Sequence, residues 1–427
     1  MKTIRDAVHG DIAFDEEEMA LVDSPPIQRL RGVKQLGASH LVFPSAVHTR
    51  FEHSLGACWL ARRILESLAL AGHEVAPDDR RTVLFTALLH DVTHVPFGHT
   101  FEDERRLFDR HDEDPARLEH FLGHSAIDAV LSRTGQSERV RAALLKRSGI
   151  SPFVREIVSG CIGADLLDYL HRDALFCGLS LRYDERLFML FRLAGDHLVV
   201  KLHKNGAVRR DALSELLHLL QMRYSLTERV YYHHAKIVAG AMVSRALELC
   251  LDAGVFAREE LYSLRDDGLL LQFERLGPRV EGLADLAGDL ADRRLYKRVF
   301  ELAPAGLGRH GLSPEERHSL AARFHVDRAS RRAAEAKLAA FLGAPESHVI
   351  VYCPSPKMSL KEADVPVEIA AGRVQTLDSL GHPDVSGLQE KHAGIWRFVV
   401  CVRREHLARR AALAEKCAEI IGFAPPA

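Results

Sequence analysis

The sequence predicts a mostly α-helical protein with a small α+β lobe at its C-terminal end. Apolar residues recur with helical spacing through most of the first 340 residues, and the period changes to that of strands from about residue 345. The composition, 47% hydrophobic and 27% charged, is that of an ordinary globular protein. A chain of 427 residues can bury one large core or two domains, so we assign 1–340 to a helical core and 341–427 to the lobe.

Charge and cysteine spacing exclude several classes of protein. The formal net charge of −2 lends no support to nucleic-acid binding, although local basic clusters keep that alternative open. The seven cysteines are scattered without a C-x-x-C pair, which predicts reduced thiols and a cytoplasmic protein. The charged segment Met1–Asp6 lacks the apolar core of a signal peptide, and no run approaches the roughly 20 apolar residues of a membrane span.

The N-terminal elements are expected to be short. An apolar strand or turn over Ile4–Ile12 precedes a helix start at Asp23-Ser-Pro-Pro, where a capping side chain is followed by prolines that the first turn tolerates. We expect that helix over Ile27–Leu36. The run His48-Thr-Arg-Phe-Glu-His53 then opens a helix to about Leu70, with His53 at the inner edge of its apolar face.

The next helix carries the most informative stretch, Ala87-Leu-Leu-His-Asp-Val-Thr-His94. His90 and Asp91 lie in an apolar run, and a buried charge is costly unless it is paired or binds a metal. Imidazole and carboxylate together suit a borderline divalent metal. We expect the helix to end near Pro96 and His94 to share the face of His90 one turn earlier. The alternative is a helix end with a hydrogen-bonded core histidine.

Further polar residues cluster after this stretch. His99 and Glu102 follow at once, and His120 and His124 are expected one turn apart on the next helix. Taken alone, each of these histidines is typical of a surface or capping residue. The predicted helix Ile162–Leu175 repeats Asp165, Tyr169 and Asp173 every four residues on one face. That stripe is either solvated or lines a cavity.

The remainder of the chain changes character at about residue 345. Residues 212–250 form a long helical stretch whose basic and aromatic side chains, Arg223 and Tyr231 among them, either hold phosphates or form a solvated face. The pattern over 252–320 is helical. Strands are expected at His348–Cys353, Val365–Ile369, Arg373–Leu377 and Trp396–Val402, followed by a helix over Arg404–Ile421.

Four residues make a pattern suited to a hydrolytic metal site. Such a site needs several histidine or carboxylate ligands and an open position for water or substrate. Two imidazoles and two carboxylates from three predicted helices supply this set: His53, His90, Asp91 and Asp165.

With these motifs the sequence resembles the HD-domain deoxynucleoside triphosphate triphosphohydrolases, in the branch of the animal SAM-and-HD-domain enzyme and its bacterial relatives. The resemblance is closest at Arg50-Phe-Glu-His-Ser-Leu-Gly56 and at His90-Asp-Val-Thr-His-Val-Pro-Phe-Gly-His99, and it covers most of the chain. It implies an HD-domain helical core, here without a SAM domain. Thr93 departs from a common glycine, and Glu102 replaces an aspartate of the animal enzyme while preserving its charge.

The resemblance also implies roles for individual residues. The metal ligands would be His53, His90, Asp91 and Asp165. The catalytic residues beside the triphosphate would be His94, His99, Glu102 and His120, with His124 as the alternative to His120. The substrate-binding residues would be Gln35, Leu36, Arg50, Tyr169, Asp173, Arg223 and Tyr231. A regulatory guanine nucleotide would contact Lys2, Asp23, Gln28 and Arg31, while Arg5 and His234 depart from the family's pattern in the adjoining pocket.

The implied activity is hydrolysis of a dNTP to deoxynucleoside and triphosphate. A divalent metal (Mg, Mn, Fe, Zn or Ni) and arginines would neutralise the polyphosphate, water or hydroxide would attack the α-phosphorus, and a histidine would act as general acid. The family's regulation implies a homo-oligomer, a dimer or a tetramer. The alternatives are an HD phosphohydrolase for a monophosphate or signalling nucleotide, and a nucleotide-sensing or nucleic-acid-binding regulator.

Overall fold

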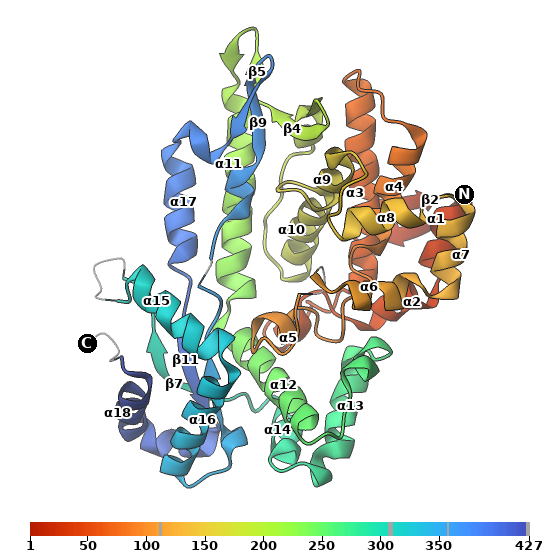
Figure 1. Ribbon diagram of the computed structural model, residues 1–427. Helices are drawn as coiled ribbons and strands as arrows, with labels where there is room; N and C mark the ends of the chain where they lie inside the picture. Colours follow the sequence, from red (N-terminus) through yellow and green to blue (C-terminus); the bar gives the residue numbers. More distant parts are fainter. Residues whose placement is uncertain (111–112, 306–310, 357, 424–427) are drawn as a thin grey trace.

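The computed structural model describes residues 1–110, 113–305, 311–356 and 358–423, and it is mostly helical as the sequence predicts (Figure 1). The helices are α1 (Glu16–Val22), α2 (Pro25–Arg29), α3 (Arg50–Leu70), α4 (Pro77–Leu89), α5 (Thr100–Asp103), α6 (Pro115–Leu122), α7 (Ser125–Arg133), α8 (Ser137–Leu144), α9 (Pro152–Ser159), α10 (Ala164–Phe176), α11 (Arg210–Leu226), α12 (His234–Asp252), α13 (Asp266–Leu276), α14 (Leu283–Ala291), α15 (Pro314–Ala321), α16 (Arg328–Leu342), α17 (Pro383–Ala393) and α18 (Arg410–Ile421). The strands are β1 (Lys2–Asp6), β2 (Gly10–Phe14), β3 (Phe191–Ala194), β4 (His197–Lys201), β5 (His203–Lys204), β6 (Ala207–Val208), β7 (Lys297–Leu302), β8 (Val349–Tyr352), β9 (Pro366–Ala370), β10 (Arg373–Thr376) and β11 (Phe398–Val402).

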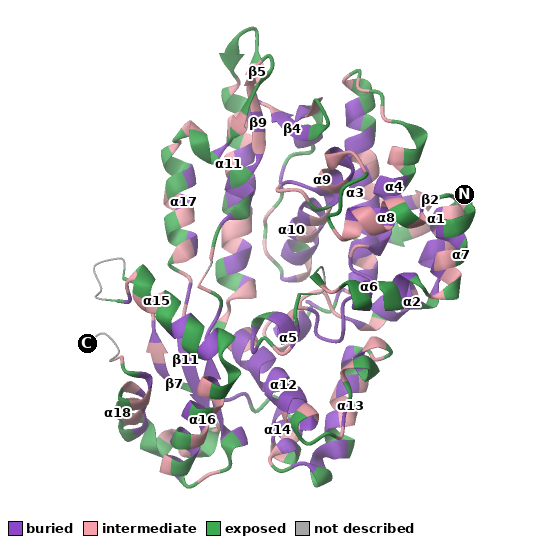
Figure 2. Cartoon of the chain, in the orientation of Figure 1, coloured by how far each residue is buried: buried purple, intermediate pink, exposed green. Residues whose placement is uncertain are grey.

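Helices α3, α4 and α10 form the centre of the N-terminal half. Their apolar faces meet in one large core with α9, and Figure 2 shows this interior as buried. A capping box sets the start of α3, in which Thr49 N–H donates to Glu52 Oε2 at 2.6 Å. The polar site described below lies at the ends of these three helices, so a rigid apolar core supports it.

Two predicted helices differ from the observed ones. The helix expected over Ile27–Leu36 is shorter, because α2 passes into a 3-10 turn at Leu30–Gly32 and a side chain at Gly32 would overlap Arg265. The stretch 212–250 is two helices, α11 and α12, separated by a π-helical turn over Thr227–Tyr231. Such turns redirect side chains and are frequent at functional sites.

A mixed sheet of order β10-β9-β4-β3 joins distant parts of the chain. Strand β9 runs parallel to β4, with Val200 opposite Val367 and Lys201 opposite Glu368. The sequence predicts β9 and β10 but not β3 or β4. One strand of the predicted C-terminal lobe, β9, thus pairs with a strand from the middle of the chain, and β10 joins the same sheet through β9.

A second sheet, of order β7-β11-β8, packs against α16 and α18 and encloses its own apolar core. The predicted strands at 348–353 and 396–402 are confirmed as β8 and β11. The helical prediction for 252–320 is wrong at β7, because pairing with β11 decides its conformation. Strand β7 precedes residue 340 but pairs with β11, and β9 follows residue 340 but pairs with β4. Both sheets therefore contain strands from both sides of the proposed domain boundary, which stays a prediction.

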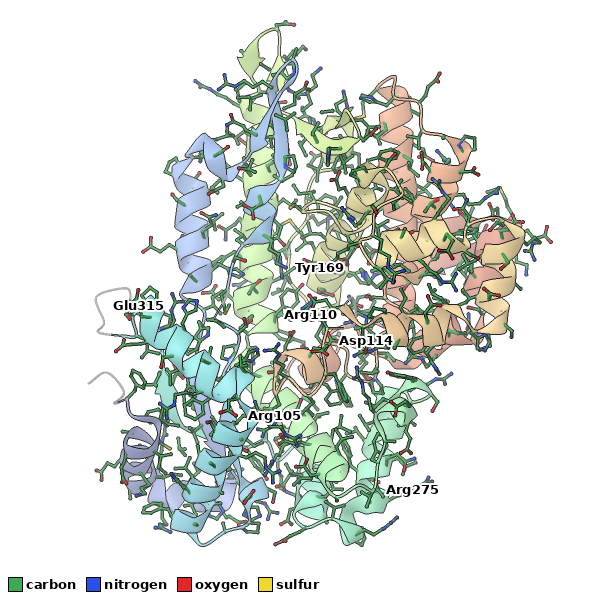
Figure 3. The ribbon with its side chains drawn as sticks, viewed as in Figure 1. Arg105, Arg110, Asp114, Tyr169, Arg275 and Glu315 are labelled. Atoms are coloured by element: carbon green, nitrogen blue, oxygen red, sulfur yellow. The ribbon has the colours of Figure 1, made fainter. Side chains whose placement is uncertain are left out.

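A buried ion network connects the N-terminal half to the C-terminal helices. Arg105 lies two residues after the end of α5 and is fully buried (Figure 3). Its Nη2 is 2.6 Å from Glu248 Oε2 on α12, and its Nη1 is 2.7 Å from Glu335 Oε1 on α16. Buried charges are tolerated when they are paired in this way. The segment that carries His99 and Glu102 is therefore anchored from the C-terminal side.

Within the ranges that the structure describes, none of the helices is long and apolar enough to cross a lipid bilayer.

Candidate active site

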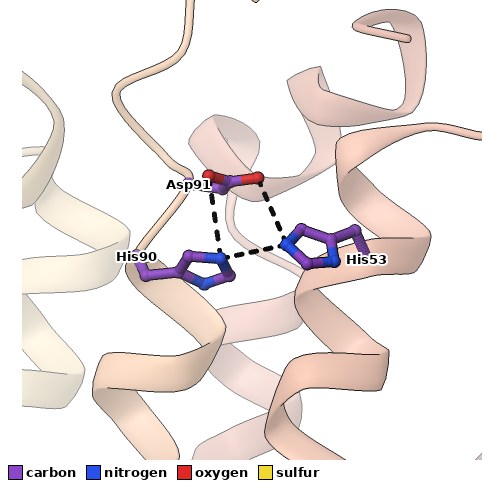
Figure 4. A group of neighbouring side chains, drawn as sticks. All are labelled: His53, His90 and Asp91. Atoms are coloured by element: carbon purple, nitrogen blue, oxygen red, sulfur yellow. Dashed lines mark hydrogen bonds and ion pairs between the residues drawn. The ribbon is translucent and has the colours of Figure 1, made fainter. Parts of the chain in front are cut away.

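Two histidines and one aspartate converge where α3 and α4 meet (Figure 4). His53 lies in the first turn of α3, His90 caps the C-terminus of α4, and Asp91 is the next residue. The Nε2 atoms of the two imidazoles face each other at 3.2 Å. Asp91 Oδ2 is 3.8 Å from His53 Nε2, and Asp91 Oδ1 is 3.7 Å from His90 Nε2. Three potential ligand atoms thus surround one point.

Asp165, in the first turn of α10, completes the set. Its Oδ1 is 3.1 Å from His53 Nε2 and 3.8 Å from His90 Nε2. The structure therefore brings together all four predicted metal ligands. A tetrahedral zinc ion with bonds of about 2.0–2.1 Å would place its ligand atoms roughly 3.3 Å apart. The observed separations of 3.1–3.8 Å fit a small divalent ion.

Both imidazoles are oriented from behind. His53 Nδ1 lies 2.7 Å from Asp168 Oδ2, and His90 Nδ1 lies 2.8 Å from the Ala87 carbonyl oxygen. Each acceptor holds a proton on Nδ1, so that Nε2, directed to the common point, is the atom that would bind a metal in place of a proton. This is the usual support for histidine ligands of a metal.

The electrostatics of the cluster favour a cation. Burial opposes ionisation of Asp91, but Arg50, His94 and His90 outweigh it and hold the pKa of Asp91 well below its ordinary value. Burial likewise opposes protonation of His53, yet hydrogen bonds with Asp165 and Asp168 raise its pKa to about 10. The carboxylates thus bind a positive charge, which a metal ion would supply in place of the proton.

The supporting network around Asp168 is the part that sequence reasoning missed. Asp168 is fully buried and accepts hydrogen bonds from Arg172 at 2.8 and 2.9 Å, and its Oδ1 lies 2.6 Å from His9 Nε2. Arg172 in turn binds Asp6 of β1 at 2.9 Å. Asp168 sits one helical turn after Asp165, and that spacing was the available signal.

The predicted catalytic residues His94, His99 and Glu102 form a chain that starts at the metal cluster. His94 Nδ1 is 3.1 Å from Asp91 Oδ1, and His94 Nε2 is 3.4 Å from His99 Nε2. His99 Nδ1 lies 3.0 Å from Glu102 Oε2, and Arg117 donates to the other oxygen of Glu102 at 3.1 Å. A proton can be held and passed along such a chain.

The expected helical register of His94 is wrong. Helix α4 ends at Leu89, and the chain continues in tight turns, with Val92 N–H bonded to Leu89 O and His94 N–H to Asp91 O, both at 3.1 Å. His94 reaches Asp91 through these turns rather than from a shared helix face. At Gly98 the chain has a φ of 60°, and a side chain there would meet the Arg50 guanidinium. Glycine is therefore required for this close approach.

His120 and His124 are not on one helix. His120 lies on the exposed side of α6 with its ring centroid 4.8 Å from that of Tyr262. His124 caps the N-terminus of α7, where its Nδ1 accepts from Ala126 N–H at 3.2 Å. Among the described residues, the ring contacts of His120 are with Phe121 and Tyr262. The catalytic assignment of His120 stays a prediction.

Four predicted substrate residues meet between α10 and the π-helical turn. Tyr231 Oη donates to Asp173 Oδ2 at 2.6 Å, and the Arg223 guanidinium lies 5.1 Å from the Tyr231 ring centroid and 5.4 Å from that of Tyr169. Within the stripe on α10, Asp173 is buried, whereas Asp165 and Tyr169 are partly exposed. His48, which sequence reasoning left without a role, lies with Nε2 2.8 Å from Asp173 Oδ1.

The three other predicted substrate residues are Arg50, Gln35 and Leu36. Arg50 is buried and donates to Asp91 Oδ2 at 2.7 Å, and its second terminal nitrogen is 3.5 Å from the Gln35 carbonyl oxygen. Gln35 Oε1 is buried and has no hydrogen-bond partner among the residues that the structure describes, and Leu36 packs at the edge of the core. Their contacts with substrate stay predictions. In this structure Arg50 donates a hydrogen bond to Asp91, one of the predicted metal ligands.

The predicted regulatory residues lie at the surface as two pairs. Lys2 Nζ is 3.9 Å from Asp23 Oδ2, and Arg31 Nε donates to Gln28 Oε1 at 2.8 Å. Arg31 also lies over the Phe51 ring at 3.6 Å. Arg5, at a departing position, pairs with Asp11.

The helical fold and the inward-facing histidine and aspartate cluster define a class of helical proteins that hold a divalent metal. Residues 50–173 match the HD domain and residues 185–422 match the HD associated region. The chain belongs to the HD-domain family, and the resemblance inferred from the sequence is confirmed.

Several relatives share this architecture. An uncharacterised protein of Methanocaldococcus jannaschii is 31% identical over 312 residues, 71% of this chain and 62% of that protein. The deoxynucleoside triphosphate triphosphohydrolase SAMHD1 of Homo sapiens is 26% identical over 353 residues, 72% of this chain and 56% of that protein. The chain thus spans less than two thirds of the length of these curated relatives. A phosphohydrolase crystal structure from Bacteroides thetaiotaomicron has the same fold, with a TM-score of 0.72 at 21% identity over 95% of this chain and 100% of that one.

Proposed function

We propose that this protein hydrolyses deoxynucleoside triphosphates to deoxynucleoside and triphosphate in a metal-dependent reaction. One observation carries the proposal. The two imidazole Nε2 atoms of His53 and His90 lie 3.2 Å apart, each oriented from behind by its own hydrogen bond. Asp91 and Asp165 place their carboxylates beside them. A site of this kind binds a divalent metal that activates water and neutralises phosphate charge.

The reaction needs a proton donor for the leaving group. Water attacks the α-phosphorus, the bond between that phosphorus and the 5′-oxygen breaks, and the 5′-oxygen of the deoxynucleoside accepts a proton. His94 Nε2 lies 3.4 Å from His99 Nε2, and Glu102 Oε2 lies 3.0 Å from the other ring nitrogen of His99. We assign the proton to this histidine pair, because an imidazole can donate near neutral pH.

The residues around Tyr169 suit the sugar of a deoxynucleotide. Tyr231 and Asp173 present a hydrogen-bonded pair that can bind the 3′-hydroxyl, and the flat Tyr169 side chain can close against a ribose that lacks its 2′-hydroxyl. Arg223 lies beside both tyrosines and is available for phosphate. The deoxynucleoside triphosphate triphosphohydrolase activity of the SAMHD1 relatives supports the dNTP substrate class. The free thiols suit a reducing compartment, and we propose the cytoplasm.

A product analysis tests this proposal. Purified protein is incubated with each dNTP, with a nucleoside monophosphate and with a cyclic nucleotide, in the presence of Mg²⁺ or Mn²⁺. We expect deoxynucleoside and intact triphosphate in equal amounts, from dNTPs alone. Asp91→Asn and His90→Ala should abolish turnover in a folded protein. Release of single phosphates with accumulating dNDP, or turnover only of the monophosphate or cyclic substrate, would assign the site to another phosphohydrolase reaction.

We further propose that a guanine nucleotide regulates a homo-oligomer through Lys2, Asp23, Gln28 and Arg31. The two surface pairs offer a carboxylate and an amide that can read a guanine edge and cations that can hold phosphate. A nucleotide that binds only the assembled protein must favour assembly by mass action. Hydrolysis of dATP and light-scattering mass should both rise on addition of dGTP. Arg31→Ala should lose that response, and an unchanged rate and mass in the wild type would refute the regulation alone.

A further inference from the structure

A second cluster of metal-ligating side chains lies far along the chain from the hydrolytic site. His348 is the last residue of the 3-10 turn before β8, and Glu405 and His406 lie in the 3-10 turn Arg404–Arg409 that leads to α18. His348 Nδ1 is 3.0 Å from His406 Nε2. Glu405 Oε1 is 3.5 Å from His348 Nδ1 and 3.7 Å from His406 Nε2. Three ligand atoms from two distant segments thus surround one point.

The geometry of this cluster matches that of a small metal ion. Ligand atoms of a tetrahedral zinc ion lie roughly 3.3 Å apart, given bonds of about 2.0–2.1 Å. The three observed separations are 3.0, 3.5 and 3.7 Å, close to the 3.1–3.8 Å of the hydrolytic site. Nitrogen and carboxylate ligands together suit zinc.

His348 is oriented as a metal ligand would be. Its side chain is only 5% exposed, and its Nε2 lies 3.2 Å from Asp285 Oδ2 on α14. Arg403 Nη1 also lies 3.3 Å from this Nε2. Zinc binding through Nδ1, the atom that faces His406 and Glu405, requires the tautomer whose Nε2 proton is donated to Asp285. The same arrangement of carboxylate behind histidine supports His53 in the hydrolytic site.

The Arg403 guanidinium lies beside the cluster and contacts His348 as well as carboxylates. Its guanidinium faces three carboxylates, with Nη1 3.1 Å from Asp285 Oδ2, Nε 2.8 Å from Asp289 Oδ2 and Nη1 3.6 Å from Glu405 Oε2. Arg403 holds Oε2 of Glu405, so the other oxygen of that carboxylate turns to the two imidazoles. Arg294 also pairs with Asp289, so two guanidinium groups face the three carboxylates of this region.

We propose that His348, Glu405 and His406 bind a zinc ion that ties the turn before α18 to the start of β8. The Glu405 side chain is 55% exposed, so the ion has a path of entry and a fourth position open to water. The site is separate from the hydrolytic one and does not depend on the reaction proposed above. In the competing arrangement the two imidazoles share only a hydrogen bond.

Counting bound zinc distinguishes the two arrangements. The full-length protein is stripped with a chelator, reloaded with zinc, desalted and analysed by mass spectrometry of the metal. We expect His53→Ala, which disrupts the hydrolytic site, to retain one equivalent at the second site. His53→Ala with His406→Gln should retain none. His318→Gln, an exposed histidine in α15, is the matched control in the same background and should keep the equivalent.

A milder variant guards against misfolding. Glu405→Gln changes an exposed side chain, so the fold should persist while zinc affinity at the second site falls at least tenfold in competition with a chromophoric chelator. Zinc should also raise the melting temperature of the His53→Ala protein, and this rise should vanish with Glu405→Gln. If His53→Ala binds no zinc, or if the His406 and Glu405 variants bind it as their background does, the imidazoles share a hydrogen bond only and the proposal is overturned.

Discussion

The carboxylate of Asp168 should control metal affinity although it is not a ligand. It lies 2.7 Å from Nδ1 of His53 and fixes the tautomer and the direction of the ring. In Asp168→Asn the shape is preserved, but the negative charge that strengthens the imidazole as a ligand is lost. Loss of such a supporting partner lowers metal affinity about 10–100-fold, or about 1.4–2.7 kcal/mol.

The same substitution should also lower stability. Arg172 is fully buried between Asp168 and Asp6, so an amide in place of one carboxylate leaves part of its charge uncompensated. Breaking a buried ion pair costs about 3–5 kcal/mol, and we expect the lower end because Asp6 remains. Asp6→Asn is the matched control, since it weakens the same guanidinium without touching His53.

The assay separates the two effects. Metal affinity is measured by titration calorimetry of the stripped protein, and stability by thermal unfolding of the same samples. Both variants should melt at a lower temperature than the wild type, but only Asp168→Asn should bind the metal more weakly. Wild-type metal affinity in a folded Asp168→Asn protein, or an equal loss of affinity in Asp6→Asn, would refute the orienting role.

Three other predictions follow from buried or catalytic contacts. A side chain at Gly56 would overlap the carboxylate of Asp168, so Gly56→Ala should destabilise the fold by about 1–3 kcal/mol in thermal unfolding, whereas Gly387→Ala in α17, with open space around it, should not. Burial opposes ionisation of Glu335, but its guanidinium partners hold its pKa below the ordinary value. Its contribution to the free energy of unfolding is therefore present above the ordinary pKa of a glutamate and is lost as the pH falls through the lowered pKa. The stability of Glu335→Gln, measured by thermal unfolding at several pH values, should fall less steeply with acid than that of the wild type. His99→Gln should slow turnover about 10²–10⁴-fold with metal content unchanged, and an active variant would exclude His99 as the proton donor.

Elements with local signals can be predicted from the amino-acid sequence alone. The helical period places His53 on α3 and Asp165 on α10, and the adjacent pair His90-Asp91 is explained by a metal because a lone buried charge is costly. Strands β8 and β11 were equally visible, since each is a short apolar run rich in valine. These features depend on residues within one turn or one strand of each other.

Long-range packing determines which residues support the site and which strands pair. Asp168 looks like any other helical aspartate until α3 brings His53 against it, and His94 owes its place to turns that follow Leu89 rather than to a helix. Strand β7 forms because β11, about 100 residues later, supplies its hydrogen-bond partners. Such contacts depend on chain segments that meet only after folding. Neither the periodicity of apolar residues nor the spacing of motifs along the chain shows which segments will meet.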